Sequence, residues 1–144
     1  RHVYKTKPLA VLKLWGRVLA RLSSSLDNKL VWSTLSASDF LKTNSAEKDL
    51  TDVVDELIVS IPQAKVIAII YENEAPAIAT EPAREKTTSL LLYAINNIDA
   101  MGLIKEFNPE GGKCLAQAII KAPVAEAEKT IITAIQDKLS KLPL

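Results

Sequence analysis

The stretch KVIAIIY, from Lys65 to Tyr71, determines how we interpret the rest of the chain. It is a continuous apolar run rich in β-branched residues, which is typical of a strand covered on both faces. The uninterrupted run Val66 to Tyr71 has only six residues, whereas a helix that crosses a bilayer needs roughly 20. We therefore expect the central strand of a buried sheet, and no membrane span.

Helical and strand patterns alternate on both sides of this run. The clearest helix lies between Ser45 and Ser60, where apolar residues recur at helical spacing before Pro62 ends the segment. In chain order we expect helices over residues 8–24, 36–42, 45–60, 97–106 and 124–142, strands over residues 29–34, 65–71, 87–93 and 115–121, and a long loop over residues 73–84. This order predicts an α/β fold, with a small mixed sheet of about four strands covered by helices. Residues 1–24 would form a leading amphipathic connector helix, residues 25–144 the domain itself, and its last element a C-terminal helix.

The composition narrows the classes of function. The chain has 144 residues, of which 48% are apolar and 24% charged, and this suits one globular domain. Its net charge is +1, so a polyanion would have to bind at a local site. The single cysteine, Cys114, and the single histidine, His2, exclude an internal disulfide and the zinc sites built from several such residues. We expect a soluble cytoplasmic protein, and the first residue, Arg1, indicates a fragment of a longer chain.

The segment Asn108 to Lys113 contains a candidate anion site. Gly111 and Gly112 would let backbone N–H groups approach a phosphate closely, and Lys113 would add a positive charge. The alternative is that the two glycines only turn the chain, because the segment lacks the pattern that flanks a Walker loop.

A basic stripe marks the first helix, where Lys13, Arg17 and Arg21 recur every four residues. Cations at this spacing either contact a phosphodiester backbone or form a solvated helix face.

Three further features each have a functional and a structural interpretation. The acidic residues of the 45–60 helix would bind Mg²⁺ or Mn²⁺, or form a solvated surface. Trp15 and Trp32 would stack on bases, or pack in the core. Cys114 would be a reactive thiol, or a bystander without a catalytic histidine nearby. The acidic residues are Asp49, Asp52, Asp55 and Glu56.

Five segments then occur in a characteristic order. They are LKLWGRVLARL (Leu12 to Leu22), KLVWSTLSASDF (Lys29 to Phe40), TDVVDELIVSI (Thr51 to Ile61), AKVIAIIYE (Ala64 to Glu72) and FNPEGGK (Phe107 to Lys113), followed by Ala116. Together they resemble the C-terminal, DHH-associated substrate-binding domain of the DHH phosphoesterase superfamily. The similarity is to the oligoribonuclease and phosphoadenosine-phosphate phosphatase branch, and more distantly to RecJ-like exonucleases, and it covers nearly the whole chain.

This resemblance implies a division of labour between two domains. In the family, an N-terminal domain binds manganese through Asp and His residues and cleaves the phosphoester, while the C-terminal domain holds the nucleotide. The present chain has no Asp-His-His motif, so the resemblance implies no catalytic residue and no metal site here, with manganese only in the missing domain. The implied partners are a short oligonucleotide such as RNA or a nucleotide phosphate, and the DHH domain in cis or in trans. A homodimer is a further partner state, and no membrane is involved.

The family's substrate-binding loop reads Gly-Gly-Gly-His, and its match here is Glu110-Gly111-Gly112-Lys113, followed by Ala116 and Ala118. Lys113 stands in the place of a histidine that donates to the substrate phosphate in the family. The family's Ser-Leu-Arg corresponds to Ser89-Leu90-Leu91, which lacks the guanidinium. Each such charge-assisted contact contributes about 1.5 to 3 kcal/mol, so losing two weakens affinity by about two powers of ten or more.

Three hypotheses follow. The first is the substrate-binding half of a DHH-family hydrolase, with phosphate held by Gly111, Gly112 and Lys113. The second is a degenerate, non-catalytic copy that serves as an interaction or dimerisation module. The third is a free-standing enzyme that uses Cys114 or the acidic residues.

Overall fold

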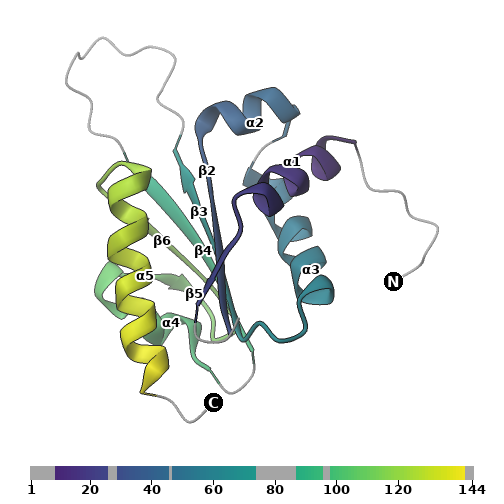
Figure 1. Cartoon of the computed structure of the whole chain (residues 1–144). Helices are drawn as coiled ribbons and strands as arrows, with labels where there is room; N and C mark the ends of the chain where they lie inside the picture. Colours follow the sequence, from purple (N-terminus) through teal and green to yellow (C-terminus); the bar gives the residue numbers. More distant parts are fainter. Residues whose placement is uncertain (1–8, 26–28, 46, 74–86, 96–97, 142–144) are drawn as a thin grey trace.

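A six-stranded mixed sheet forms the centre of the protein (Figure 1). The computed structural model describes residues 9–25, 29–45, 47–73, 87–95 and 98–141. The strand order is β1-β2-β3-β4-β6-β5, in which β2 and β3 are parallel and all other neighbours are antiparallel. The strands are β1 (Ser23–Ser25), β2 (Leu30–Leu35), β3 (Val66–Glu72), β4 (Thr88–Ala94), β5 (Glu110–Gly111) and β6 (Leu115–Ile120).

The strand β3 lies in the interior of the sheet, between β2 and β4. Every residue from Val66 to Tyr71 is buried, which confirms the prediction of a central strand covered on both faces. Its alternate residues face opposite sides of the sheet, so the one strand contributes to two separate hydrophobic cores.

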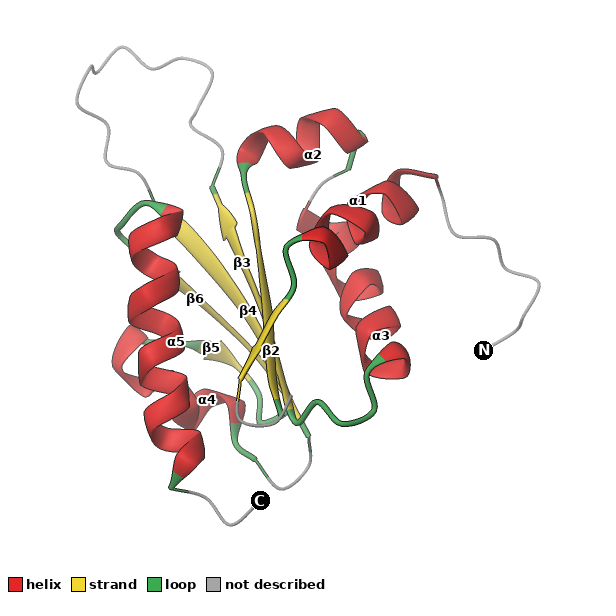
Figure 2. Cartoon of the chain, viewed as in Figure 1, coloured by secondary structure: helices red, strands yellow, loops and turns green. Residues whose placement is uncertain are grey.

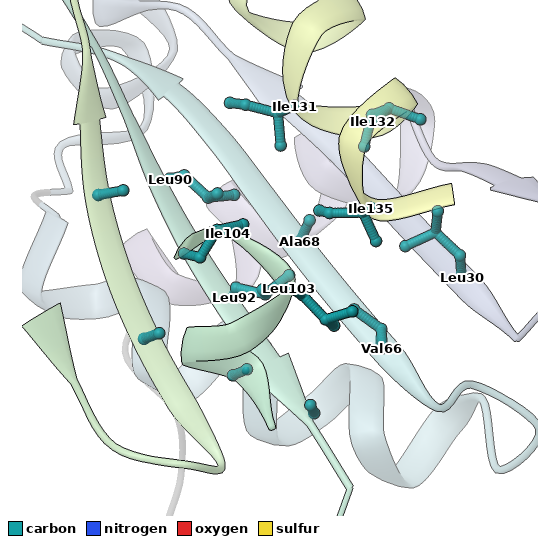
Figure 3. Packing of buried hydrophobic residues seen from close by; sticks show 14 of the residues in the cluster. Leu30, Val66, Ala68, Leu90, Leu92, Leu103, Ile104, Ile131, Ile132 and Ile135 are labelled. Carbon is teal, nitrogen blue, oxygen red and sulfur yellow. The ribbon is translucent and has the colours of Figure 1, made fainter. Parts of the chain in front are cut away.

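Helices cover both faces of the sheet and make three layers (Figure 2). They are α1 (Leu9–Ala20), α2 (Ala37–Thr43), α3 (Leu50–Ser60), α4 (Ala100–Leu103) and α5 (Val124–Ser140), with short 3-10 turns η1 (Glu47–Asp49) and η2 (Lys105–Phe107). We call the core beneath α4 and α5 the α5-side core, and the core beneath α1 and α3 the α1-side core. Figure 3 shows the α5-side core, where Ile131, Ile132 and Ile135 of α5 lie over Ala68 and Leu90.

The predicted mixed α/β fold is confirmed, but the sheet has six strands rather than about four. The two additional strands, β1 and β5, are three and two residues long, which is too short to show an alternating pattern. Both lie at the edges of the sheet: β1 overlaps the end of the helix expected over residues 8–24, which stops at Ala20, and β5 lies in the glycine-containing segment Asn108 to Lys113. The helix expected over residues 97–106 is also shorter, since α4 has four residues and continues as η2. The loop expected over residues 73–84 falls almost wholly outside the described residues.

The short helix α2 begins as its sequence predicts. Ser36 is the N-cap, its hydroxyl accepts from the Asp39 amide, and the Asp39 carboxylate accepts from the Ser36 amide, which completes a capping box. The leading helix α1 packs on α2, α3 and β2, and its Val11, Leu14 and Val18 are buried. Across the described residues, none of the helices combines the length and the apolar character that crossing a membrane requires.

One half of the sheet lacks a helix on the α1 side. On the α1 side of the sheet, α1 and α3 lie over β2 and β3. None of the described helices covers β6 on that side. On this face Gln117 is exposed and Ile119 keeps 66% of its surface accessible. The uncovered half of the sheet is therefore where a site or a partner has access to strand side chains.

Candidate functional site

A pocket of about 620 Å³ opens at the end of the sheet where β3 finishes and β4 begins. We call it the sheet-end pocket. Its walls come from β3, β4, β6 and the segment from η2 to β5, which the fold brings together from positions far apart in sequence. The lining residues are Tyr71, Asn73, Thr87, Ser89, Leu90, Phe107, Asn108, Glu110, Gln117, Ala118 and Ile119.

Hydrogen bonds hold one wall of this pocket in place. The Ser89 hydroxyl donates to Asn73 Oδ1 at 2.7 Å, and Asn73 Nδ2 donates to Thr87 Oγ1 at 2.8 Å. The Asn73 amide also donates to the Thr87 carbonyl at 3.1 Å. The Asn73 side chain is thus fixed, while each of its polar atoms retains capacity for one more hydrogen bond.

The remaining polar groups of the pocket point to its chemistry. Gln117 is exposed and forms no side-chain hydrogen bond with another described residue, so its amide can both donate and accept. Glu110 is the only carboxylate among the described lining residues, which include no Lys, Arg or His. Tyr71 and Phe107 add aromatic surface. The pocket therefore suits a ligand with hydroxyls, amides or a ring, such as a nucleoside, better than a bare phosphate.

The glycine loop lies in the β5–β6 hairpin. Gly111 has φ +124°, a backbone conformation that favours glycine. In addition, a Cβ at this position would lie 2.5 Å from the Leu115 carbonyl oxygen. The Gly112 amide donates to the same carbonyl at 2.8 Å, and the Lys113 carbonyl accepts from the Ala100 amide at 2.7 Å. The Gly112 amide is therefore already used within the hairpin.

The register of the hairpin separates this loop from the sheet-end pocket. Glu110 pairs with Gln117 and Gly111 with Ala116, so the turn that carries Lys113 lies before the start of β6, whereas the pocket is lined further along, from Gln117 onward. Glu110 lines the pocket, while Gly111, Gly112 and Lys113 are exposed and line neither described cavity.

The three residues Ser89-Leu90-Leu91 of β4 do not all lie at the same site. Ser89 and Leu90 line the sheet-end pocket. Leu91 is buried in the α1-side core, packed among apolar residues. A guanidinium at this position would be expensive to bury there without a partner.

The basic stripe of α1 forms a second cavity together with α2. A groove of about 520 Å³ is lined by Lys13, Gly16, Arg17, Ala20, Arg21, Lys42 and Thr43, and we call it the basic groove. The structure thus brings the three predicted cations together and adds Lys42, which the sequence did not single out. The only signal for Lys42 was its place near the end of the short predicted helix.

Asp39 holds the two arginines of the stripe. Arg17 Nη1 donates to Asp39 Oδ1 at 2.8 Å, and Arg21 donates to both carboxylate oxygens, at 3.0 Å to Oδ1. Burial alone raises the pKa of Asp39, but hydrogen bonds from Arg21, from the Ser36 amide and from Arg17 lower it more. The carboxyl pKa therefore lies well below its ordinary value, and the pKa of Arg21 is raised, first by its hydrogen bond with Asp39. A carboxylate with 1% of its surface exposed is fully paired here.

The other sequence candidates remain outside both cavities. Across the described ranges, the structure has no group of three or more His, Cys, Asp or Glu residues that could hold a metal ion. The acidic residues of α3 and η1 therefore form no such group; they are Asp49, Asp52, Asp55 and Glu56. Trp15 and Trp32 each pack against a hydrophobic core, and the Trp32 indole donates to Glu128 at 2.8 Å. Cys114 is exposed in the β5–β6 hairpin.

Comparison with known proteins gives a structural likeness only. No family model matches the sequence, and no curated protein matches it. The fold is similar to a crystal structure of an exopolyphosphatase-related protein from Bacteroides fragilis, with a TM-score of 0.73 and 19% sequence identity. The similarity covers 94% of this chain and 36% of that protein. The chain therefore shares the fold of about a third of a larger protein.

Proposed function

We propose that this chain is the substrate-binding domain of a DHH-type phosphoesterase, which holds a short oligonucleotide or a nucleotide phosphate in the cytoplasm. The likeness to one part of an exopolyphosphatase-related protein supports a phosphoesterase-associated domain. Manganese and the residues that cleave the ester would belong to an N-terminal DHH domain outside this sequence, acting in cis or in trans.

The observation that carries this proposal is the sheet-end pocket. Its amides and hydroxyls from Asn73, Ser89 and Gln117 can pair with a base or a ribose, and its aromatic side chains can contact a ring. Glu110 can accept hydrogen bonds from ribose hydroxyls. We assign the nucleoside part of the substrate to this pocket. The phosphate contact of Gly111, Gly112 and Lys113 remains a separate part of the proposal, because these residues do not line the pocket.

Calorimetric titration with the dinucleotide pApA tests the pocket. Gln117→Ala removes an exposed amide and should weaken binding by about two- to tenfold, as expected for one neutral hydrogen bond. Gln63→Ala is the matched control, because Gln63 is exposed in the turn after α3 and lines neither cavity. Equal affinities for the wild type and Gln117→Ala would contradict a nucleoside site here.

Lys113→Ala, titrated with the same dinucleotide at two salt concentrations, tests the phosphate contact. Loss of a charge-assisted contact should weaken binding by about tenfold or more and reduce the salt dependence. Unchanged, equally salt-dependent binding would remove Lys113 from the site and leave the pocket assignment standing.

The second candidate function is an interaction or dimerisation module. The observation that favours it is the uncovered half of the sheet, where Ile119 is 66% exposed beside Gln117. The two functions differ in a simple measurement: sedimentation velocity over a range of concentrations, with and without pApA. Self-association together with no dinucleotide binding would favour the module over the substrate-binding domain.

A further inference from the structure

The basic groove between α1 and α2 combines two kinds of cation. Arg17 and Arg21 are held by Asp39, whereas Lys13 and Lys42 form no ion pair with any other described residue. The four basic side chains converge from α1, from the residue that follows it and from α2, and the two helices pack on each other. Among the described residues, only the buried carboxylate of Asp39 is paired with them, so the described part of the groove keeps an excess of positive charge.

Asp39 orients the two arginines but uses only some of their N–H donors. A guanidinium has five N–H donors in a fixed plane. Arg17 directs one donor to Asp39, and Arg21 uses its two terminal nitrogens on Asp39 and on the Thr34 carbonyl. The arginine side chains remain 36% and 42% exposed, so donors with little freedom to move still face the groove. This arrangement lowers the entropic cost of binding an anion.

The floor of the groove is open because two of its residues are small. Gly16 and Ala20 lie between the cations on α1, and a Cβ placed on Gly16 would meet no atom within 4 Å. A volume of about 520 Å³ therefore lies among the four cations.

We propose that the basic groove is a binding site for phosphate groups, separate from the sheet-end pocket. Arginine forks match the oxygens of a phosphate, and the lysines add flexible donors from both sides. Two sources share this chemistry, namely a phosphate ester of a nucleotide strand and a condensed inorganic phosphate. The site does not depend on the proposed function, since no residue lines both cavities.

Titration of the 144-residue chain with inorganic tripolyphosphate and, separately, with the trinucleotide pApApA tests the site. Lys13→Ala and Lys42→Ala should each weaken binding about tenfold and lower the dependence on salt. Lys129→Ala is the control of equal charge, because Lys129 is exposed on α5 and lines neither cavity. The ligand that binds more tightly to the wild type and loses more affinity in the two variants identifies the source.

A second variant fills the groove without removing a cation. Gly16→Glu places a carboxylate among the basic side chains and should abolish binding of tripolyphosphate, whereas any pApApA binding that remains should be weakened by adding Gln117→Ala. The fold should tolerate it, because replacing glycine inside a helix raises helix propensity. Ala125→Glu introduces the same charge on an exposed position of α5 and should leave binding unchanged.

Tripolyphosphate binding that survives Gly16→Glu, or that falls equally in Lys13→Ala and Lys129→Ala, would overturn the proposal, as would no binding of either ligand by the wild type. These outcomes are distinct from failure of the sheet-end pocket, which Gln117→Ala reports.

Discussion

The residue on which the α1–α2 contact depends is Asp39. Its buried carboxylate accepts from the Ser36 amide, from Arg17 of α1 and from Arg21, which directly follows α1. Asp39→Asn should lower the free energy of unfolding at pH 7 by about 2 to 4 kcal/mol, since it weakens charged hydrogen bonds and a helix cap. Urea denaturation measures this change. Asp55→Asn, at an exposed position of α3, should change stability by less than about 0.5 kcal/mol.

The same residue sets a pH dependence. The pKa of Asp39 is lower in the folded chain than in the unfolded chain, where it is about 3.9. Its stabilisation is therefore complete above pH 4 and is lost as the pH falls further toward the folded pKa. The stability difference between wild type and Asp39→Asn should stay the same from pH 6 to pH 5 and narrow when urea titrations are repeated from pH 4 to pH 3, because the Asp39 carboxyl protonates there in the unfolded chain but not yet in the folded chain. A constant difference would contradict the low folded pKa.

The interaction of Asp39 also shows what sequence could reveal at this scale. The capping box of Ser36 and Asp39 and the basic repeat of α1 were each visible as local patterns. Their contact spans 18 and 22 residues of chain, and local spacing carries no information on it. Lys42 remained unrecognised for the same reason, because its importance arises only from the neighbouring helix.

At the scale of elements, the β5–β6 hairpin depends on Gly111. Gly111→Ala should destabilise the hairpin by more than about 1 kcal/mol, because an alanine Cβ would clash with the Leu115 carbonyl and the positive φ disfavours it. Amide exchange at Gly112, which donates to that carbonyl, should speed up. Gly112→Ala is the control, since a Cβ there meets nothing within 4 Å. Equal amide exchange rates at position 112 in the two variants would contradict a special conformational requirement at Gly111.

The length of an element decided whether the sequence could predict it. The long continuous apolar run of β3 and the long amphipathic helix α5 were predicted close to their observed bounds. The strands β1 and β5 have no pattern of their own, because pairing with a longer neighbour makes them strands. The sheet-end pocket needs residues of β3, β4, β5, β6 and η2 together, and local patterns gave no indication that Asn73, Thr87 and Gln117 would line it.

At the scale of the whole molecule, two cores share one sheet. Val66, Ala68 and Ile70 of β3 belong to the α5-side core, and Ile67 and Ile69 belong to the α1-side core. Neither core can lose its packing while the shared strand keeps its pairing and burial. We therefore expect the described domain to unfold as one cooperative unit, although its two helical layers do not cover the sheet equally.

The chain carries its own reporters for this expectation. It has two tryptophans, of which Trp15 packs against the α1-side core and Trp32 against the α5-side core. In Trp32→Phe the fluorescence reports the α1-side core, and in Trp15→Phe it reports the α5-side core. In each variant the fluorescence and far-ultraviolet circular dichroism curves in urea should coincide. Adding Ile69→Ala to either variant should shift both curves together, by about 2 to 5 kcal/mol. If Ile69→Ala moved the Trp15 signal and left the Trp32 signal in place, the two layers would be independent and β3 would not couple them.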